Sequence, residues 1–247
     1  MPSPALNMVL QQLDNAARQA NRPSARLLAV SKRQSATAVA ELTAAWVEQP
    51  GNTTPAFGEN YVQEALAKQA ALARHERHSS VEWHLIGHLQ SNKAGEAATA
   101  FDWVQTVDRV KLVALLATHR PAQRGRLNVL VQVNVDDESS KHGCHPDEIA
   151  TLAAAIVRQP QLALRGLMSI PAPYPEMTRR REAFGQMKLL FDKLHVQYPQ
   201  VDTLSMGMSE DFTIAVAEGA TMVRVGTALF GAREMQHGTR THVVIAP

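Results

Sequence analysis

A regular alternation of short apolar runs with helix-patterned stretches is the feature that most constrains the fold of this chain. The apolar runs are often β-branched, as buried parallel strands tend to be. They predict strands at Arg26–Ser31, Pro55–Gly58, Glu82–Gly87, Trp103–Thr106, Leu127–Val135, Ala163–Met168, Thr203–Met206 and Met222–Val225. Helix-like patterns lie between them at Ala36–Val47, Asn60–Arg74, Arg109–Thr118, Pro146–Arg158, Glu176–Val196 and Glu210–Glu218. Alternation of this kind predicts a parallel sheet whose strands are connected by helices.

The number of units favours a closed sheet over an open one. Eight units in 247 residues fit a single α/β domain over residues 1–247, a (β/α)₈ TIM barrel. The first residues, MPSPALNMVLQQLDNAARQ, predict an extra amphipathic helix before the barrel. A doubly wound open sheet is the alternative. It usually requires a glycine-rich turn after the first strand, and the sequence SKRQ at residues 31–34 is not one.

Composition excludes several classes of function. A net charge of +2 and an aromatic content of 5% do not indicate a nucleic-acid-binding surface. No apolar run approaches the roughly 18 residues of a membrane span, and the N-terminus lacks the basic flank of a signal peptide. The lone Cys144 cannot form an internal disulfide, so we expect a reducing, cytoplasmic location. No spacing of Cys, His and carboxylates predicts a metal site.

Functional side chains in such barrels gather at the carboxyl ends of the strands, which directs attention to the end of the first strand. There the sequence reads LLAVSK, and strand alternation places Leu28, Val30 and Lys32 on one face. This face can direct Lys32 into the top of the barrel, where a partly desolvated lysine has a lowered pKa and can attack a carbonyl. Taken alone, the pattern also fits an ordinary solvated lysine at a strand end.

The last strand, MVRV, carries an arginine in an apolar setting. Val223 and Val225 share one face and Arg224 takes the other. If the valines pack on the helices, Arg224 points into the barrel. An unpaired buried charge is very costly, so Arg224 then needs either a carboxylate partner or a ligand.

An anion site is predicted close to this strand. Gly226 and Thr227 open a short helix over 228–232, whose first N–H groups and hydroxyl can bind an anion. The loop after the eighth strand is a frequent phosphate site in barrels. Ser209 precedes the helix of the previous unit, where it can either cap that helix or join the same cradle. Asn60 similarly either caps the helix after strand two or contacts a ligand.

Several blocks together resemble the pyridoxal phosphate homeostasis protein family (YggS/PROSC, also called PLP-binding protein). They read LLAVSK, FGENYVQE, WHLIGHLQSNK, GLMSIP, LSMGMSEDF and VRVGTALFGAR, occur in the family's order and end at Arg233. The resemblance implies a barrel similar to the N-terminal domain of alanine racemase, a fold type III domain for pyridoxal 5′-phosphate (PLP). It also implies that the second, β-rich domain of that enzyme is absent.

The resemblance also implies residue roles. Lys32 matches the lysine that holds PLP as a Schiff base, and Arg224 the arginine that faces the pyridine nitrogen. The phosphate cradle matches Ser209, Gly226 and Thr227, Asn60 lies beside the ring, and Met206, Met208 and Ser169 fall in blocks near the cofactor. Lys141 lies in a Lys-x-Gly loop that the family shares, and no role is assigned to it.

These roles predict a PLP-binding protein that acts in intracellular vitamin B6 homeostasis and amino-acid balance, without a fast catalytic cycle. An arginine leaves the pyridine nitrogen neutral, and racemisation needs a second acid or base that racemases take from their other domain. The expected partners are PLP and PLP-dependent apoenzymes, with no nucleic acid and no membrane, and the expected state is a monomer. A weak PLP-dependent amino-acid racemase is the alternative, in which Tyr61 or His84 would serve as the base. A third possibility is an aldolase-type barrel that uses Lys32 without PLP.

Overall fold

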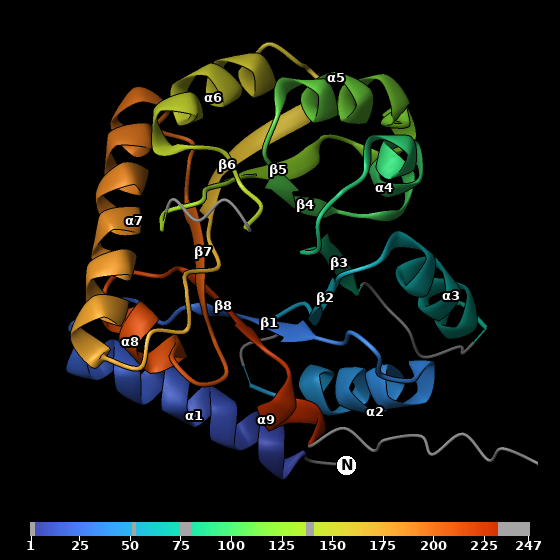
Figure 1. Cartoon of the computed structure of the whole chain (residues 1–247). Coiled ribbons are helices and arrows are strands. Elements are labelled where there is room, and N and C mark those ends of the chain that lie inside the picture. The colour runs from blue at the N-terminus through green and yellow to red at the C-terminus, as the bar shows by residue number, and fades with distance from the viewer. Residues whose placement is uncertain (1–2, 51–52, 75–80, 137–140, 232–247) are drawn as a thin grey trace, which may run out of the picture.

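The computed structural model describes residues 3–50, 53–74, 81–136 and 141–231 (Figure 1). Its eight parallel strands close into one barrel in sequence order, with β1 paired to β8, which confirms the predicted architecture. The strands are β1 Arg26–Val30, β2 Ala56–Glu59, β3 Glu82–Leu85, β4 Trp103–Val107, β5 Leu127–Gln132, β6 Leu162–Met168, β7 Thr203–Met208 and β8 Met222–Val225.

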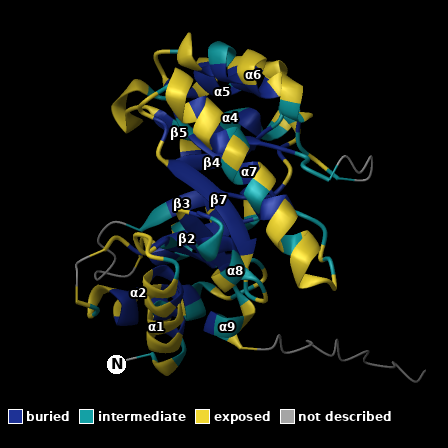
Figure 2. Cartoon of the chain, turned by 90° about the vertical axis from the view of Figure 1, so that its left-hand side faces the viewer, coloured by how far each residue is buried: buried dark blue, intermediate teal, exposed yellow. Residues whose placement is uncertain are grey.

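Helices surround the barrel as an outer layer, and their outward faces are exposed to solvent (Figures 1 and 2). They are α1 Pro4–Gln19, α2 Ala36–Val47, α3 Val62–Leu72, α4 Ala94–Ala100, α5 Val110–His119, α6 Ile149–Val157, α7 Met177–Gln197, α8 Phe212–Ala217 and α9 Thr227–Phe230. Helix α4 was not predicted, because its buried face consists of alanines alone and leaves no apolar stripe in the sequence. None of the described helices has both the length and the apolar character needed to cross a bilayer.

The predicted N-terminal helix α1 covers the side of the barrel that carries the last units. Ser3 caps it by accepting a hydrogen bond from the backbone N–H of Leu6 at 3.3 Å, and Pro4 occupies its first turn. Leu6, Val9 and Leu13 form its buried stripe. The helix packs against α8 and α9, and therefore supports the turn that follows β8 (Figure 1).

Strand alternation separates two apolar regions. Val223 and Val225 of β8 join the large core between strands and helices, whereas Met222 faces the barrel interior with Leu28. Arg224 is paired in register with Leu28 of β1, and its side chain is buried on the same inner face. The inward orientation predicted for Arg224 from alternation is confirmed.

Candidate functional site

A cavity of about 250 Å³ opens at the carboxyl ends of β1, β2, β7 and β8. The predicted site residues that line it are Lys32, Asn60, Met208, Ser209, Arg224, Gly226 and Thr227. The remaining lining comes from Val30, Gln34, Ile86, Ile170 and Gly231. Its volume is close to the lower end of the range for small-molecule pockets, about 300 Å³.

Two of the predicted residues lie behind the cavity. Ser169 is fully buried, and its backbone carbonyl accepts a hydrogen bond from Arg224 Nη2 at 2.7 Å. Met206 is also fully buried, but it packs in the outer core between the barrel and the helices. The structure therefore gives Ser169 a supporting position for Arg224, and it places Met206 on the opposite side of β7.

Lys32 projects from a tight turn at the end of β1. The backbone N–H of Ser31 donates to the carbonyl of Gly58, which extends the sheet by one residue. Gln34 N–H donates to the carbonyl of Ser31, and Arg33 adopts a left-handed conformation with φ of 61°. Lys32 Nζ lies 5.8 Å from the ring centroid of Tyr61, and it makes no hydrogen bond or ion pair with any described residue.

Charged side chains packed beneath the Lys32 turn stabilise it. Lys68 Nζ of α3 donates to Glu59 Oε1 and to the carbonyl of Ser31, both at 2.6 Å, and to Glu64 Oε1 at 2.8 Å. Ser31 Oγ also donates to Glu59 Oε1 at 2.6 Å, and Glu64 accepts from the backbone N–H of Arg33. The residues on both sides of Lys32 are thus tied to one set of ion pairs.

Glu59 is the most deeply buried acid of this set. Its side chain has no exposed surface, and burial raises its pKa, although Lys68 and Ser31 act in the opposite direction. Sequence reasoning missed this set. Glu59 and Glu64 belong to the FGENYVQE block without a distinguishing pattern, and Lys68 is one more polar residue of a surface helix.

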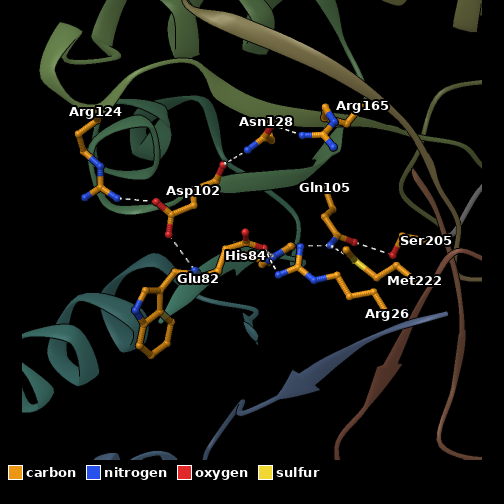
Figure 3. Close-up of polar contacts among 11 residues, drawn as sticks. Arg26, Glu82, His84, Asp102, Gln105, Arg124, Asn128, Arg165, Ser205 and Met222 are labelled. Atoms are coloured by element: carbon orange, nitrogen blue, oxygen red, sulfur yellow. Dashed lines mark hydrogen bonds and ion pairs between the residues drawn. The ribbon is translucent and has the colours of Figure 1, made fainter. Parts of the chain in front are cut away.

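A buried polar row runs through the barrel from Arg224 to Glu82, and Figure 3 shows its part from Ser205 to Glu82. Arg224 Nη1 donates to Ser205 Oγ at 2.7 Å, and Ser205 Oγ donates to Gln105 Oε1 at 2.7 Å. Gln105 Nε2 lies 2.8 Å from His84 Nδ1, and His84 Nε2 lies 2.5 Å from Glu82 Oε1. If Gln105 donates to His84 Nδ1 and His84 carries its proton on Nε2, every hydrogen bond in the row is donated in the direction of Glu82.

The charges at the two ends explain this direction. Burial lowers the pKa of Arg224 to about 10, which leaves it charged at neutral pH, and no ion pair to it is found among the described residues. Burial alone would raise the pKa of Glu82, but the hydrogen bond from His84 and the charge of Arg26, 2.8 Å away, outweigh it and lower the pKa to about 2. Burial also lowers the pKa of His84, so the ring between the two charges is neutral.

The anion cradle at the other end of the cavity forms between two units. Gly226 N–H donates to Ser209 Oγ at 3.2 Å, and Thr227 begins α9 directly afterwards. Ser209 does not cap α8, because that helix begins at Phe212 with Asp211 at the N-cap position. The polar groups of the two turns therefore converge on the cavity.

Asn60, like Ser209, does not cap a helix. Helix α3 begins at Val62, with Tyr61 at the N-cap position and no side-chain cap. Asn60 instead lines the cavity. Its side chain is therefore in position to contact a ligand.

Two other residues singled out in the sequence have structural partners. Lys141 Nζ pairs with Asp136 Oδ2 at 2.5 Å, and Asp136 also accepts from Ala172 N–H and from the hydroxyl of Tyr174. This contact ties the segments after β5 and β6 together. Cys144 is buried, which raises its pKa to about 12 and keeps it in the unreactive thiol form.

The lining thus combines a primary amine, a buried guanidinium and a cradle of hydroxyl and N–H groups. An amine without a protein partner can condense with an aldehyde. The guanidinium can donate to a ring nitrogen, and the cradle can hold a phosphate. A small aldehyde that carries a ring nitrogen and a phosphate would satisfy all three.

Residues 6–234 match the family of the alanine racemase N-terminal domain. The pyridoxal phosphate homeostasis protein of Escherichia coli (strain K12) is 49% identical over 211 residues, which cover 84% of this chain and 86% of that protein. The pyridoxal phosphate homeostasis protein of Pasteurella multocida (strain Pm70) is 46% identical over 233 residues, covering 93% of this chain and 96% of that protein.

Solved structures give the same picture. PipY of Synechococcus elongatus PCC7942, in its structure without PLP, has a TM-score of 0.80 and 35% identity, covering 94% of this chain and all of that one. The structure of PipY with PLP bound has a TM-score of 0.74 and 36% identity, covering 90% of this chain. Alanine racemase of Clostridium difficile 630 has a TM-score of 0.64 at 13% identity, covering 92% of this chain and 57% of the enzyme, and therefore shares the fold alone.

Proposed function

The chain belongs to the family of pyridoxal phosphate homeostasis proteins, and on this premise we propose that it holds PLP as a Schiff base on Lys32 and acts in PLP homeostasis. The observation that carries the proposal is the shared cavity of Lys32, Arg224 and the cradle at Ser209, Gly226 and Thr227. The PLP-bound structure of PipY supports it. We propose that the whole chain works as one domain.

The lining residues fit the cofactor chemically. When bound, PLP supplies an electrophilic aldehyde and an electron-withdrawing pyridine ring. Lys32 would provide the amine for the aldehyde, and Asn60 would contact the ring. Arg224 stays charged at neutral pH, so it would donate a hydrogen bond to the ring nitrogen and keep that nitrogen unprotonated. Ser209, Thr227 and the first N–H groups of α9 bind the phosphate.

The protein acts as a carrier or buffer and not as a fast enzyme. Racemisation requires a second acid or base on the opposite face of the ring. His84 cannot provide it, because both its nitrogens are engaged inside the barrel. Tyr174 donates its hydroxyl to Asp136, and Tyr198 packs against the outer core. Tyr61 presents its ring face toward Lys32 and is 54% exposed, and its hydroxyl makes no hydrogen bond with the described residues that would hold it in position.

Exchange of the cofactor with other proteins follows from the position of the cavity on the rim. Lys32 is half-buried, and Ile170 and Met208 of the lining are 39% and 38% exposed. PLP bound there stays accessible from outside, so a PLP-dependent apoenzyme can receive it. A monomer leaves this rim open for such a partner.

The test is an absorption spectrum of the purified protein before and after borohydride, with Lys32→Ala and with Lys93→Ala as a matched surface control. We expect a yellow wild type and control, with PLP fixed on Lys32 after reduction, and a colourless Lys32→Ala. A colourless wild type that added PLP does not convert would contradict the proposal and would leave the aldolase-type chemistry of Lys32.

The racemase alternative is tested separately with Tyr61→Phe. If the purified protein racemises amino acids with substantial turnover and Tyr61→Phe abolishes it, the carrier role is wrong. Turnover near the rate of free PLP in both proteins supports the carrier.

A further inference from the structure

Three side chains on the barrel rim converge outside the cavity of Lys32. His88 follows β3, Asp108 directly follows β4, and His142 lies in the segment after β5. These strands are neighbours in the barrel and end on one rim, so residues far apart in the sequence meet there. None of the three lines the Lys32 cavity.

Their donor atoms are spaced like ligands of one ion. Each residue offers a ligand atom, and these atoms lie within 4.8 Å of one another. The rings of His88 and His142 stack with centroids 3.8 Å apart, and His88 Nδ1 lies 3.7 Å from Asp108 Oδ2. The last distance is too long for a hydrogen bond. A tetrahedral ion with bonds of about 2.0–2.1 Å places neighbouring ligand atoms roughly 3.4 Å apart. Binding therefore requires the three donor atoms to close in from within 4.8 Å and the stacked rings to turn toward the ion.

The backbone on both sides of His88 is held in place, and so is the carboxylate of Asp108. Thr106 Oγ donates to the carbonyl of Gly87 at 2.9 Å, and Arg109 Nη2 donates to the carbonyl of Leu89 at 2.8 Å. Arg109 Nη1 also donates to Asp108 Oδ1 at 2.6 Å, which leaves Oδ2 directed toward His88.

The backbone around His142 is equally constrained. Its carbonyl accepts a hydrogen bond from Gln132 Nε2 at 3.1 Å, and the backbone of Cys144 pairs with that of Val133 in an isolated parallel β-bridge. Gly143 has φ of 122°, and a Cβ there would lie 2.7 Å from the backbone nitrogen of Asn134. The loop therefore requires glycine to approach β5 this closely, and it holds His142 over His88.

The cluster also borders a hollow on the barrel rim. A pocket of about 440 Å³, lined by His88, His142, Asn60 and Lys93 among others, leaves space for a water or small ligand beside the cluster.

We propose that His88, Asp108 and His142 bind a divalent ion of the late first transition series, with Zn²⁺ the best match. Two imidazoles and one carboxylate suit zinc with one further position open to the pocket. Calcium and magnesium prefer sets made of oxygen alone. None of the three ligands lines the PLP cavity, although Asn60 borders both hollows, so the site does not depend on the function proposed above.

Isothermal titration of the full-length protein, as purified, with zinc chloride in a non-coordinating buffer tests the site. The matched control is His145→Ala, because His145 is an exposed histidine three residues from His142 that pairs with Asp147 at 2.6 Å. We expect one zinc per chain in the wild type and the control. Each of His88→Ala, His142→Ala and Asp108→Asn should weaken binding at least about tenfold, since even supporting residues of metal sites contribute that much.

A spectrum of the cobalt-substituted protein provides the second measurement. Cobalt bound by this set should give the intense visible bands of a four-coordinate ion, and the alanine variants should lose them. Either of two results would overturn the proposal: no zinc binding by the wild type, or unchanged affinity in both His88→Ala and His142→Ala. Because both histidines are exposed, the variants should keep the wild-type melting temperature, which shows that lost binding is not lost folding.

Discussion

Lys68→Met should both destabilise the protein and loosen the turn that carries Lys32. Methionine keeps the length of the side chain in α3 but removes the cation that lies 2.6 Å from Glu59 and 2.8 Å from Glu64. Removing one partner of a buried ion pair costs about 3–5 kcal/mol, because the other charge remains buried. Four kcal/mol corresponds to about three powers of ten in the folding equilibrium.

The cost should depend on pH in a defined direction. Burial already raises the pKa of Glu59 above its usual value of 4.5, and loss of Lys68 raises it further. Glu59 can then become neutral in the folded state, which relieves the buried charge at acidic pH. The difference in stability between wild type and variant should therefore be small near pH 4.5 and grow toward neutral pH.

Urea denaturation at several pH values measures this difference, and PLP titration by absorbance measures the effect on Lys32. The control is Lys93→Met, which removes a half-exposed lysine that pairs with Glu96 at 2.8 Å and should cost less than about 1 kcal/mol. PLP affinity should fall in Lys68→Met and stay unchanged in the control. Equal stabilities of the two variants at pH 7, or a loss that does not shrink with acid, would refute the reasoning.

Three further predictions concern the buried polar row and the lone thiol. The carboxylate of Glu82 has a lowered pKa of about 2, so it stabilises the fold above its unfolded pKa of about 4.5, and this stability is lost as pH falls toward 2. Glu82→Gln should therefore cost roughly 2 kcal/mol of stability at pH 7 and make acid denaturation below pH 4.5 less steep. Arg224→Glu should protonate the pyridine nitrogen and red-shift or intensify the cofactor band, and an unchanged spectrum at normal occupancy would count against the position of Arg224. Cys144 should resist iodoacetamide at pH 8 until the protein is unfolded, because its pKa is about 12, and rapid labelling of the native protein by mass spectrometry would contradict this.

The sequence predicts those parts of the site that depend on strand alternation and chain order. Alternation placed Arg224 inside the barrel on the condition that Val223 and Val225 pack against the helices, as they do. The alternation of β1 together with the turn after β8 placed Lys32 and Gly226 on one rim. The sequence does not predict contacts between units that are distant along the chain. The pairing of Lys68 with Glu59, the row from Ser205 to His84, and the meeting of His88 with His142 all depend on how the barrel closes.

Local ambiguity accounts for the other differences. Ser209 and Asn60 are both ordinary helix-capping residues, and only the observed helix starts at Phe212 and Val62 free them for a ligand. Met206 belongs to a sequence block near the cofactor, but membership of a block does not say which face of β7 a side chain takes. The side chain of Met206 packs in the outer core.

The buried polar row connects the amino ends of the barrel strands to the cavity at their carboxyl ends. In most barrels the amino ends of the strands serve stability, while the carboxyl ends serve function. Here Arg26 and Glu82, at the amino ends of β1 and β3, lie partly open to solvent. His84, Gln105 and Ser205 connect them to Arg224 in the lining of the cavity. An ion or protein that binds beneath the barrel and competes for Glu82 would thus change the electronic environment of the cavity without touching its lining.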